Sequence, residues 1–136
     1  MDFLRSINVA ASGLKAQSGR MRIIAENIAN ADSTAPTANG TPYQRKIPTF
    51  RTSFDKELDA QVVQLGRIQR DSAPFNSKYE PGNPAADANG YVKTPNVNSL
   101  IEQMDLREAQ RSYEANLGVI GATRRMLTRT LDILRA

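Results

Sequence analysis

The stretch "LIEQMDLREAQRSYEANLGVIGATRRMLTRTLDILRA", residues 100–136, carries the seven-residue apolar repeat that decides the fold class. One heptad position and its supporting positions three or four residues away hold Leu106, Tyr113, Leu117, Ile120, Leu127, Leu131 and Leu134. This spacing places them on one face of a helix, which we predict over residues 98–135. At 1.5 Å per residue such a helix is about 57 Å long. A compact domain of this size is shorter than that, so part of the helix must project or be covered by neighbours.

Two local features of this helix carry expectations. Ser99 precedes Glu102 by three residues, which predicts a capping box at the helix start. Gly118 and Gly121 lie in the middle of the helix, where each costs about 1 kcal/mol relative to alanine. Close approach of another helix and simple flexibility both explain these glycines, and the sequence leaves the choice open.

Residues 3–31 repeat the heptad pattern at the other end of the chain. One heptad position holds Ile7, Leu14, Met21 and Ile28, and the other holds Leu4, Ala11, Ser18 and Ala25. We therefore predict a mainly α protein in which the N- and C-terminal helices pair as a coiled-coil-like unit. A second apolar flank, with Val9, Ala10, Ile23 and Ile24, lies off this seam. A single antiparallel partner helix would leave it in water, so we expect additional partners.

The end of the first helix is marked by polar residues in "NIANADSTAP", residues 27–36. Asn and Ser side chains compete for backbone hydrogen bonds, and Pro36 disfavours a helical residue before it. Spacing alone therefore favours a helix-terminating role for Asn27 and Asn30. A buried Asn can also fix the register between helices.

The region between the helices is polar and rich in proline. Alternating or β-branched residues predict short strands in "YQRKIPTF" (43–50), "AQVVQLGRIQRD" (60–71) and "GYVKTP" (90–95), the last after a turn at Asn89-Gly90. At 136 residues the chain has the length of one ordinary domain. We predict a discontinuous helical core, residues 1–31 and 98–136, and an irregular β-containing module, residues 32–97.

Composition excludes most common catalytic chemistry. The chain has no Cys, His or Trp, so thiol nucleophiles, imidazole bases and the usual transition-metal sites are absent. Asp55, Glu57 and Asp59 alternate, but no second acidic cluster accompanies them, which favours a solvated face over a metal or glycosidase site. No apolar run of about 20 residues and no cleaved signal are evident. We expect no enzyme activity, no cofactor, no metal and no membrane span.

The net charge is +4, and arginines are concentrated near the C-terminus. Basic side chains suit a helix C-terminus. They also allow a second interpretation, a basic helical module that binds nucleic acid or a partner helix; the interleaved acids argue against nucleic acid.

Four motifs together resemble the flagellar basal-body rod proteins. They are "AASGLKAQSGRMRIIAENIANADST" (10–34), "PYQRKIPTF" (42–50), "YEPGNPAADANGYVKTPNVN" (79–98) and "DLREAQRSYEANLGVIGATRRML" (105–127). The first and last are similar to motifs shared by rod, hook and hook-associated proteins. The middle two resemble proximal-rod proteins of the FlgC type, with Asn83 where that pattern has His.

The resemblance implies a structural subunit that is exported by the flagellar type III apparatus and assembled into the rod crossing the periplasm. It implies helical assembly with copies of itself and other rod proteins, with ring proteins as further candidates, and without nucleic acid. For Asn27 it favours inter-subunit hydrogen bonds over helix termination. The expected assembly residues are Leu4, Ile7, Leu14, Met21, Asn27, Ile28, Asn30, Leu106, Tyr113, Glu114, Asn116, Leu117, Ile120, Leu127 and Leu131. Tyr113 lies on the seam, where we expect it to pack in the core. Glu114 and Asn116 lie off the seam, where solvent and an arginine of a neighbouring subunit are equally open, and we expect them to contribute register more than affinity.

Overall fold

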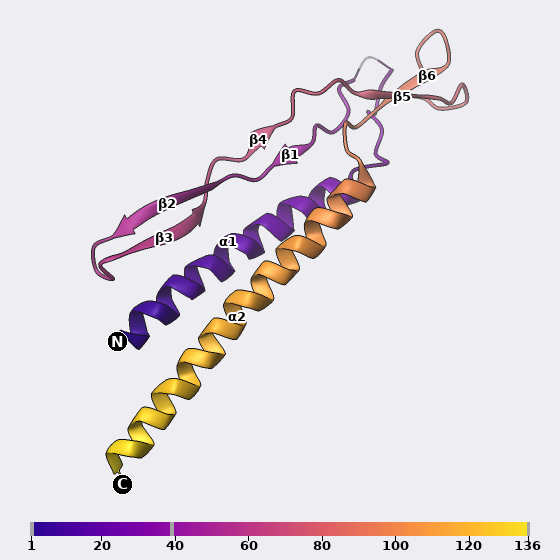
Figure 1. Ribbon diagram of the computed structural model, residues 1–136. Helices are drawn as coiled ribbons and strands as arrows, with labels where there is room; N and C mark the ends of the chain where they lie inside the picture. The colour runs from indigo at the N-terminus through magenta and orange to yellow at the C-terminus, as the bar shows by residue number, and fades with distance from the viewer. Residues whose placement is uncertain (1, 39, 136) are drawn as a thin grey trace. The chain divides into compact units, whose positions relative to one another are not determined.

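The computed structural model describes residues 2–38 and 40–135, and Figure 1 shows its two long helices and the extended segments between them. The helices are α1 (Phe3–Ala29) and α2 (Ser99–Arg135). The strands are β1 (Lys46–Ile47), β2 (Phe50–Asp55), β3 (Ala60–Leu65), β4 (Gln69–Arg70), β5 (Asn76–Tyr79) and β6 (Tyr91–Thr94). The predicted class, two long terminal helices with a small β module, is confirmed. Residues 1, 39 and 136 of the predicted segments lie outside the described residues.

The strands form three separate antiparallel pairs, β1 with β4, β2 with β3 and β5 with β6. Strands were predicted in all three quoted segments, but β5 was not predicted and β2 runs five residues past the quoted segment. The turn at Asn89-Gly90 is confirmed: Gly90 has a φ of 83°, and the Asp87 carboxylate accepts hydrogen bonds from the amides of Asn89 (2.8 Å) and Tyr91 (2.9 Å).

The chain divides into two compact units, each built from distant segments. Unit 1 comprises Met1–Met21, Thr49–Arg67 and Arg107–Ala136, and unit 2 comprises Arg22–Pro48 and Ile68–Leu106. Each unit contains parts of both helices together with strands. The division predicted from sequence separates the terminal helices from the middle module, whereas these units are defined by compactness. The predicted division therefore stays a prediction.

Unit 1 packs α1 against α2 through small side chains. Ala10, Ala16, Ala109 and Thr123 are buried. Gly13 faces Asn116 so closely that a Cβ added at Gly13 would lie 2.9 Å from the Asn116 side-chain oxygen. Small residues let helix backbones approach closely, so this pairing depends on the absence of a side chain at Gly13. The β2–β3 hairpin adds Val62 to the buried set.

Unit 2 buries the flank of α1 that the heptad seam left out. Ile23 and Ile24 are almost completely buried, together with Val92 and Val97 from the middle of the chain. The additional partner expected for these two isoleucines is supplied by unit 2 itself, which covers them. By contrast, Ala25 on the predicted seam is exposed, as are Leu4, Ala11 and Ser18 in unit 1.

Local side-chain hydrogen bonds begin and end the helices. Asp2 caps α1 by accepting from the Arg5 amide (3.0 Å). At the end of α1 the Asn30 side chain donates to the Glu26 carbonyl (2.8 Å), as expected for a helix-terminating asparagine. The capping box at the start of α2 was wrong. Asn98 caps the helix by accepting from the amides of Leu100 (3.1 Å) and Ile101 (3.4 Å), and the Glu102 carboxylate points elsewhere.

Neither helix, as far as the structure describes it, combines the length and apolar character that crossing a membrane requires.

Candidate assembly surfaces and their supporting polar network

A buried asparagine, Asn27, lies at the centre of a polar network in unit 2. Its side-chain amide donates to the Lys46 carbonyl (2.8 Å) and to Glu102 (3.0 Å). Its oxygen accepts from the Tyr43 hydroxyl (2.8 Å) and from the Lys46 amide (3.0 Å). All four hydrogen-bonding positions of this amide are therefore used within the chain. A bond from Asn27 to a neighbouring subunit would have to displace one of them.

Glu102 and Arg45 form the charged part of the same network. Glu102 is 1% exposed, and its carboxylate accepts from the Arg45 Nε at 2.5 Å. The Arg45 guanidinium also contacts Asp71 (3.4 Å) and Asp105 (3.8 Å). Burial works against the charged guanidinium, but the hydrogen bonds and charges of Glu102 and Asp71 outweigh it and raise the pKa of Arg45. The Arg45 guanidinium is therefore charged throughout the physiological pH range.

Tyr43 is held in its neutral form by the same surroundings. Burial, followed by the negative charges of Glu26 and Glu102, raises the pKa of Tyr43 to about 12. The protonated hydroxyl is the form that donates to Asn27.

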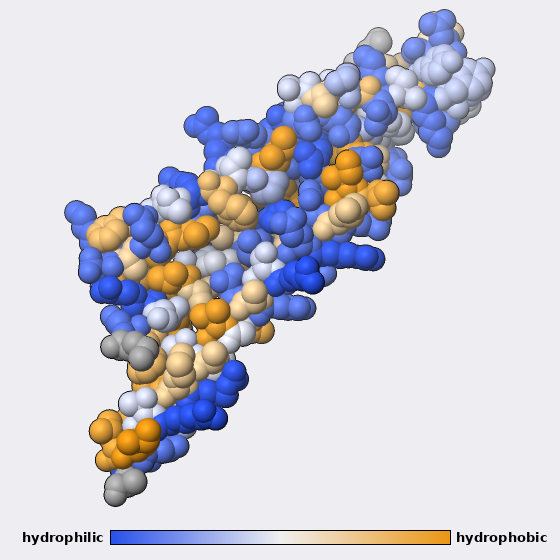
Figure 2. Space-filling model, in the orientation of Figure 1, coloured by the Kyte–Doolittle hydropathy of each residue, from blue (hydrophilic) through white to orange (hydrophobic). Residues whose placement is uncertain are grey.

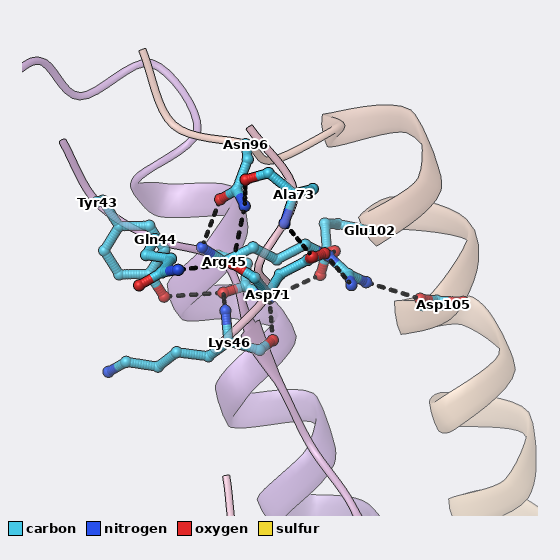
Figure 3. A network of polar contacts seen from close by, with 10 residues as sticks. Tyr43, Gln44, Arg45, Lys46, Asp71, Ala73, Asn96, Glu102 and Asp105 are labelled. Atoms are coloured by element: carbon cyan, nitrogen blue, oxygen red, sulfur yellow. Dashed lines mark hydrogen bonds and ion pairs between the residues drawn. The ribbon is translucent and has the colours of Figure 1, made fainter. Parts of the chain in front are cut away.

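The network ties three distant parts of the chain together. Asn96 accepts from the Arg45 amide (2.8 Å), and its own amide donates to the carbonyls of Asp71 (3.2 Å) and Ala73 (3.0 Å) (Figure 3). Sequence analysis missed Arg45, Asp71, Asn96 and Glu102. No periodicity marks such residues, because each is explained only by a partner far away in sequence.

The second candidate feature is the large apolar surface that α2 leaves uncovered. In unit 1 the exposed large apolar residues of this helix are Leu117, Val119, Met126, Leu127, Leu131, Ile133 and Leu134. Figure 2 shows hydrophobic residues at the surface along the free end of α2. At 100° per residue, most of these residues, from Val119 onward, fall within an arc of about 180° of the helix. The opposite arc holds Arg124, Arg125, Arg129 and Arg135.

This apolar arc exceeds what α1 can cover. Two contacts fix the pairing in unit 1, Gly13 against Asn116 and an ion pair between Arg20 and Glu108 (3.7 Å). If the antiparallel register set by these two contacts is continued towards the start of α1, Phe3 lies opposite about residue 126 of α2. The last turns of α2 therefore extend beyond α1 (Figure 1).

The predicted assembly residues divide into three groups by exposure. Exposed are Leu4, Glu114, Leu117, Leu127 and Leu131. Partly covered by the chain itself are Ile7, Leu14, Met21, Ile28, Asn30, Leu106, Tyr113, Asn116 and Ile120. Only Asn27 is fully buried. The exposed and half-buried residues remain available for contacts between subunits.

The alternating carboxylates serve local structure. Asp55 caps the β2–β3 turn by accepting from the amides of Glu57 (2.9 Å) and Leu58 (3.2 Å). Asp59 adopts a φ of 46° in this turn and pairs with Arg5 (3.4 Å). Within residues 2–38 and 40–135, no group of three or more potential metal-ligating side chains gathers.

Two family models of flagellar basal-body rod proteins match the two ends of the chain. Residues 7–35 match the flagella basal body rod protein family, and residues 88–133 match the C-terminal family of flagellar basal body rod FlgEFG proteins.

Curated relatives extend the match over nearly the whole chain. The flagellar basal-body rod protein FlgC of Agrobacterium fabrum is 51% identical over 128 residues, which cover 94% of this chain and 92% of that protein. FlgC of Bacillus subtilis is 40% identical over 148 residues, covering 98% and 99%. FlgC of Salmonella typhimurium is 40% identical over 134 residues, covering 98% of each. The chain therefore belongs to the flagellar basal-body rod proteins of the FlgC type and is a structural component of the basal-body rod.

Proposed function

We propose that this rod subunit polymerises through the apolar arc of α2 and the exposed positions of α1, in contact with copies of itself and with other rod proteins. The observation that carries the proposal is the row of exposed apolar side chains on α2, which no described part of the chain covers. Exposed apolar patches of this kind mark interaction sites in soluble proteins. Two different surfaces that meet head to tail can repeat without closing, which is how a helical rod grows.

The further roles expected for the chain follow from this proposal. Its work is structural and needs no catalytic group; the relatives are named as rod proteins. Export by the type III apparatus and contacts with surrounding ring proteins are part of the proposal. The assembly residues are the exposed and half-buried members of the predicted set. Asn27 contributes indirectly, because it holds the segment from Tyr43 to Lys46 against α1.

The test compares two aspartates on adjacent positions of α2. Leu127 lies on the apolar arc and Thr128 faces away from its centre, and both are exposed. Leu127→Asp and Thr128→Asp are introduced into a flagellated strain that lacks its own copy. A buried unpaired charge costs several kcal/mol at each repeated contact. Leu127→Asp should therefore abolish motility and rod completion, and Thr128→Asp should retain both.

Far-ultraviolet circular dichroism and thermal unfolding of the purified variants provide the folding control. Because Leu127 is already 38% exposed, Leu127→Asp should remain folded. A folded Leu127→Asp variant that supports normal swimming would contradict assembly through this arc.

A further inference from the structure

The β2–β3 hairpin in unit 1 has one protected edge and one open edge. β3 lies towards α1, since its Val63 amide donates to the Ser12 hydroxyl (3.2 Å) and its Val62 side chain is 5% exposed. β2 forms the other edge, and among the described residues β3 is its only partner strand (Figure 1). The outer side of β2 therefore has no neighbour within this sheet.

The register shows which backbone groups are open. The Gly66 amide donates to the Thr49 carbonyl (2.6 Å), so position 49 belongs to the positions that bond to the opposite strand. Antiparallel pairs alternate between hydrogen-bonded and non-hydrogen-bonded positions. Arg51, Ser53 and Asp55 therefore bond to β3. The amide and carbonyl groups at positions 50, 52 and 54 are directed away from β3, towards the open edge.

The same three positions carry an exposed apolar side. Phe50 and Phe54 are 42% and 56% exposed. Side chains two residues apart lie on one face of a strand, so both rings are on the same face as Thr52. Natural proteins usually protect an edge strand with charges, proline or a covering element. An edge with unpaired backbone groups and two exposed aromatic rings is instead suited to strand pairing.

We propose that the open edge of β2 pairs with β2 of a second copy of this chain, antiparallel and related by a two-fold axis at Thr52. In this register Phe50 lies opposite Phe54 of the second copy, and the reverse pair forms by symmetry. Such cross-strand aromatic pairs are favourable. On the other face Arg51 lies diagonal to Asp55 of the second copy, which pairs opposite charges twice. The sequence of β2 is thus complementary to itself.

This pairing is a property of the free chain and does not depend on the proposed assembly through α2. A two-fold axis turns the second copy around, whereas head-to-tail contacts repeat one orientation. The pair therefore closes as a dimer and does not grow into a filament.

Thr52→Cys tests the pairing directly, because the chain has no cysteine of its own. Opposite residues of a hydrogen-bonded pair have Cα atoms about 5.5 Å apart, within the range that a disulfide spans. Val63→Cys is the matched control, since Val63 lies opposite Thr52 on the same face of the hairpin. In the paired dimer, position 63 of one chain would lie three strand spacings, about 14 Å, from position 63 of the second copy, which is too far for a disulfide. Oxidation should link most of Thr52→Cys into dimers and little of Val63→Cys.

Thr52→Pro provides a second, non-covalent test. Proline removes an amide that faces outwards, so the pairing within the hairpin is retained while the edge loses its central donor. In analytical ultracentrifugation the wild-type chain should shift from monomer to dimer with concentration, and Thr52→Pro should stay monomeric with unchanged circular dichroism. Equal cross-linking of the two cysteine variants, a wild-type chain that stays monomeric, or a Thr52→Pro variant that dimerises like the wild type would each overturn the proposal. Thr52→Pro should still support motility, which separates this proposal from rod assembly.

Discussion

Gly13 and Gly118 are both in the interior of a helix, but their surroundings differ. A Cβ at Gly13 would lie within 3.0 Å of three atoms of the Asn116 side chain, whereas a Cβ at Gly118 would meet nothing within 4 Å. Alanine gains about 1 kcal/mol of helix propensity at either position. Gly118→Ala should therefore raise the free energy of unfolding by about that amount. Gly13→Ala should raise it by less, because the Asn116 side chain must move to make room for the added Cβ. Urea unfolding measures both, and an equal gain would mean that the contact at Gly13 has no energetic role.

Glu102 is the residue whose removal should be most damaging to unit 2. Glu102→Ala removes the fully buried acceptor of the Arg45 Nε and one of the two acceptors of the Asn27 amide. Breaking a buried ion pair in this way costs about 3 kcal/mol. Glu108→Ala is the control, because Glu108 is 67% exposed in its ion pair with Arg20 and should cost less than about 1 kcal/mol. Similar losses in the two unfolding curves would be evidence against a buried network.

Sequence reasoning at this scale identified Asn27 but not its role. Asn occurs both at helix ends and at buried positions where it fixes the register between helices, and its surroundings decide between the two roles. Its partners Tyr43, Lys46 and Glu102 lie up to 75 residues away. Glu102 itself carried a misleading local signal, since its spacing from Ser99 fits a capping box.

At the scale of elements, the start of α2 gives a prediction that separates the two capping arrangements. Asn98→Ala removes the acceptor for the first amides of the helix and should cost about 1 kcal/mol. Ser99→Ala should change the free energy of unfolding little, because the Asn98 side chain already caps these amides. The reverse order of these two effects in thermal unfolding would restore the capping box predicted from the sequence.

The helices were predictable as elements, and the strands only in part. The seven-residue repeats and the polar residues after α1 specify long helices with clear ends, which the structure confirms to within two residues. β5 has no apolar alternation, and all four of its residues are exposed. It exists because it pairs with β6, and Tyr79 and Tyr91 pack edge to face across that pair with ring centroids 5.3 Å apart. Pairing of this kind is not encoded in either strand alone.

For the whole molecule, the distribution of charge separates assembly from nucleic-acid binding. Basic residues outnumber acidic ones in unit 1 but not in unit 2, and arginines line one side of the end of α2. Binding based on phosphate neutralisation weakens steeply as salt rises from 50 to 200 mM. Complexes formed through the apolar arc should persist over this range, as measured by sedimentation of the chain with other rod proteins. A complex lost in 200 mM salt would favour a basic binding module instead.

The architecture of the whole chain was predictable only as far as its helices. The length of the predicted C-terminal helix correctly indicated that residues of α2 remain uncovered, whereas the heptad seam misplaced the face of α1 that the chain buries for itself. The sequence predicts additional partners for Ile23 and Ile24, but nothing local shows that unit 2 folds over them. The apolar periodicity of one segment does not show which of its residues are buried by segments distant in sequence.

The composition of unit 2 has a consequence for the order in which the protein can fold during synthesis. Its central carboxylate, Glu102, belongs to the last third of the chain, whereas Asn27 and the isoleucines beside it are made early. A nascent chain that lacks residues beyond about 98 has no α2 to complete either unit, and closing contacts so distant in sequence is slow. The N-terminal two-thirds therefore leaves the ribosome without a finished core. Neither unit can therefore be completed before α2 has been synthesised.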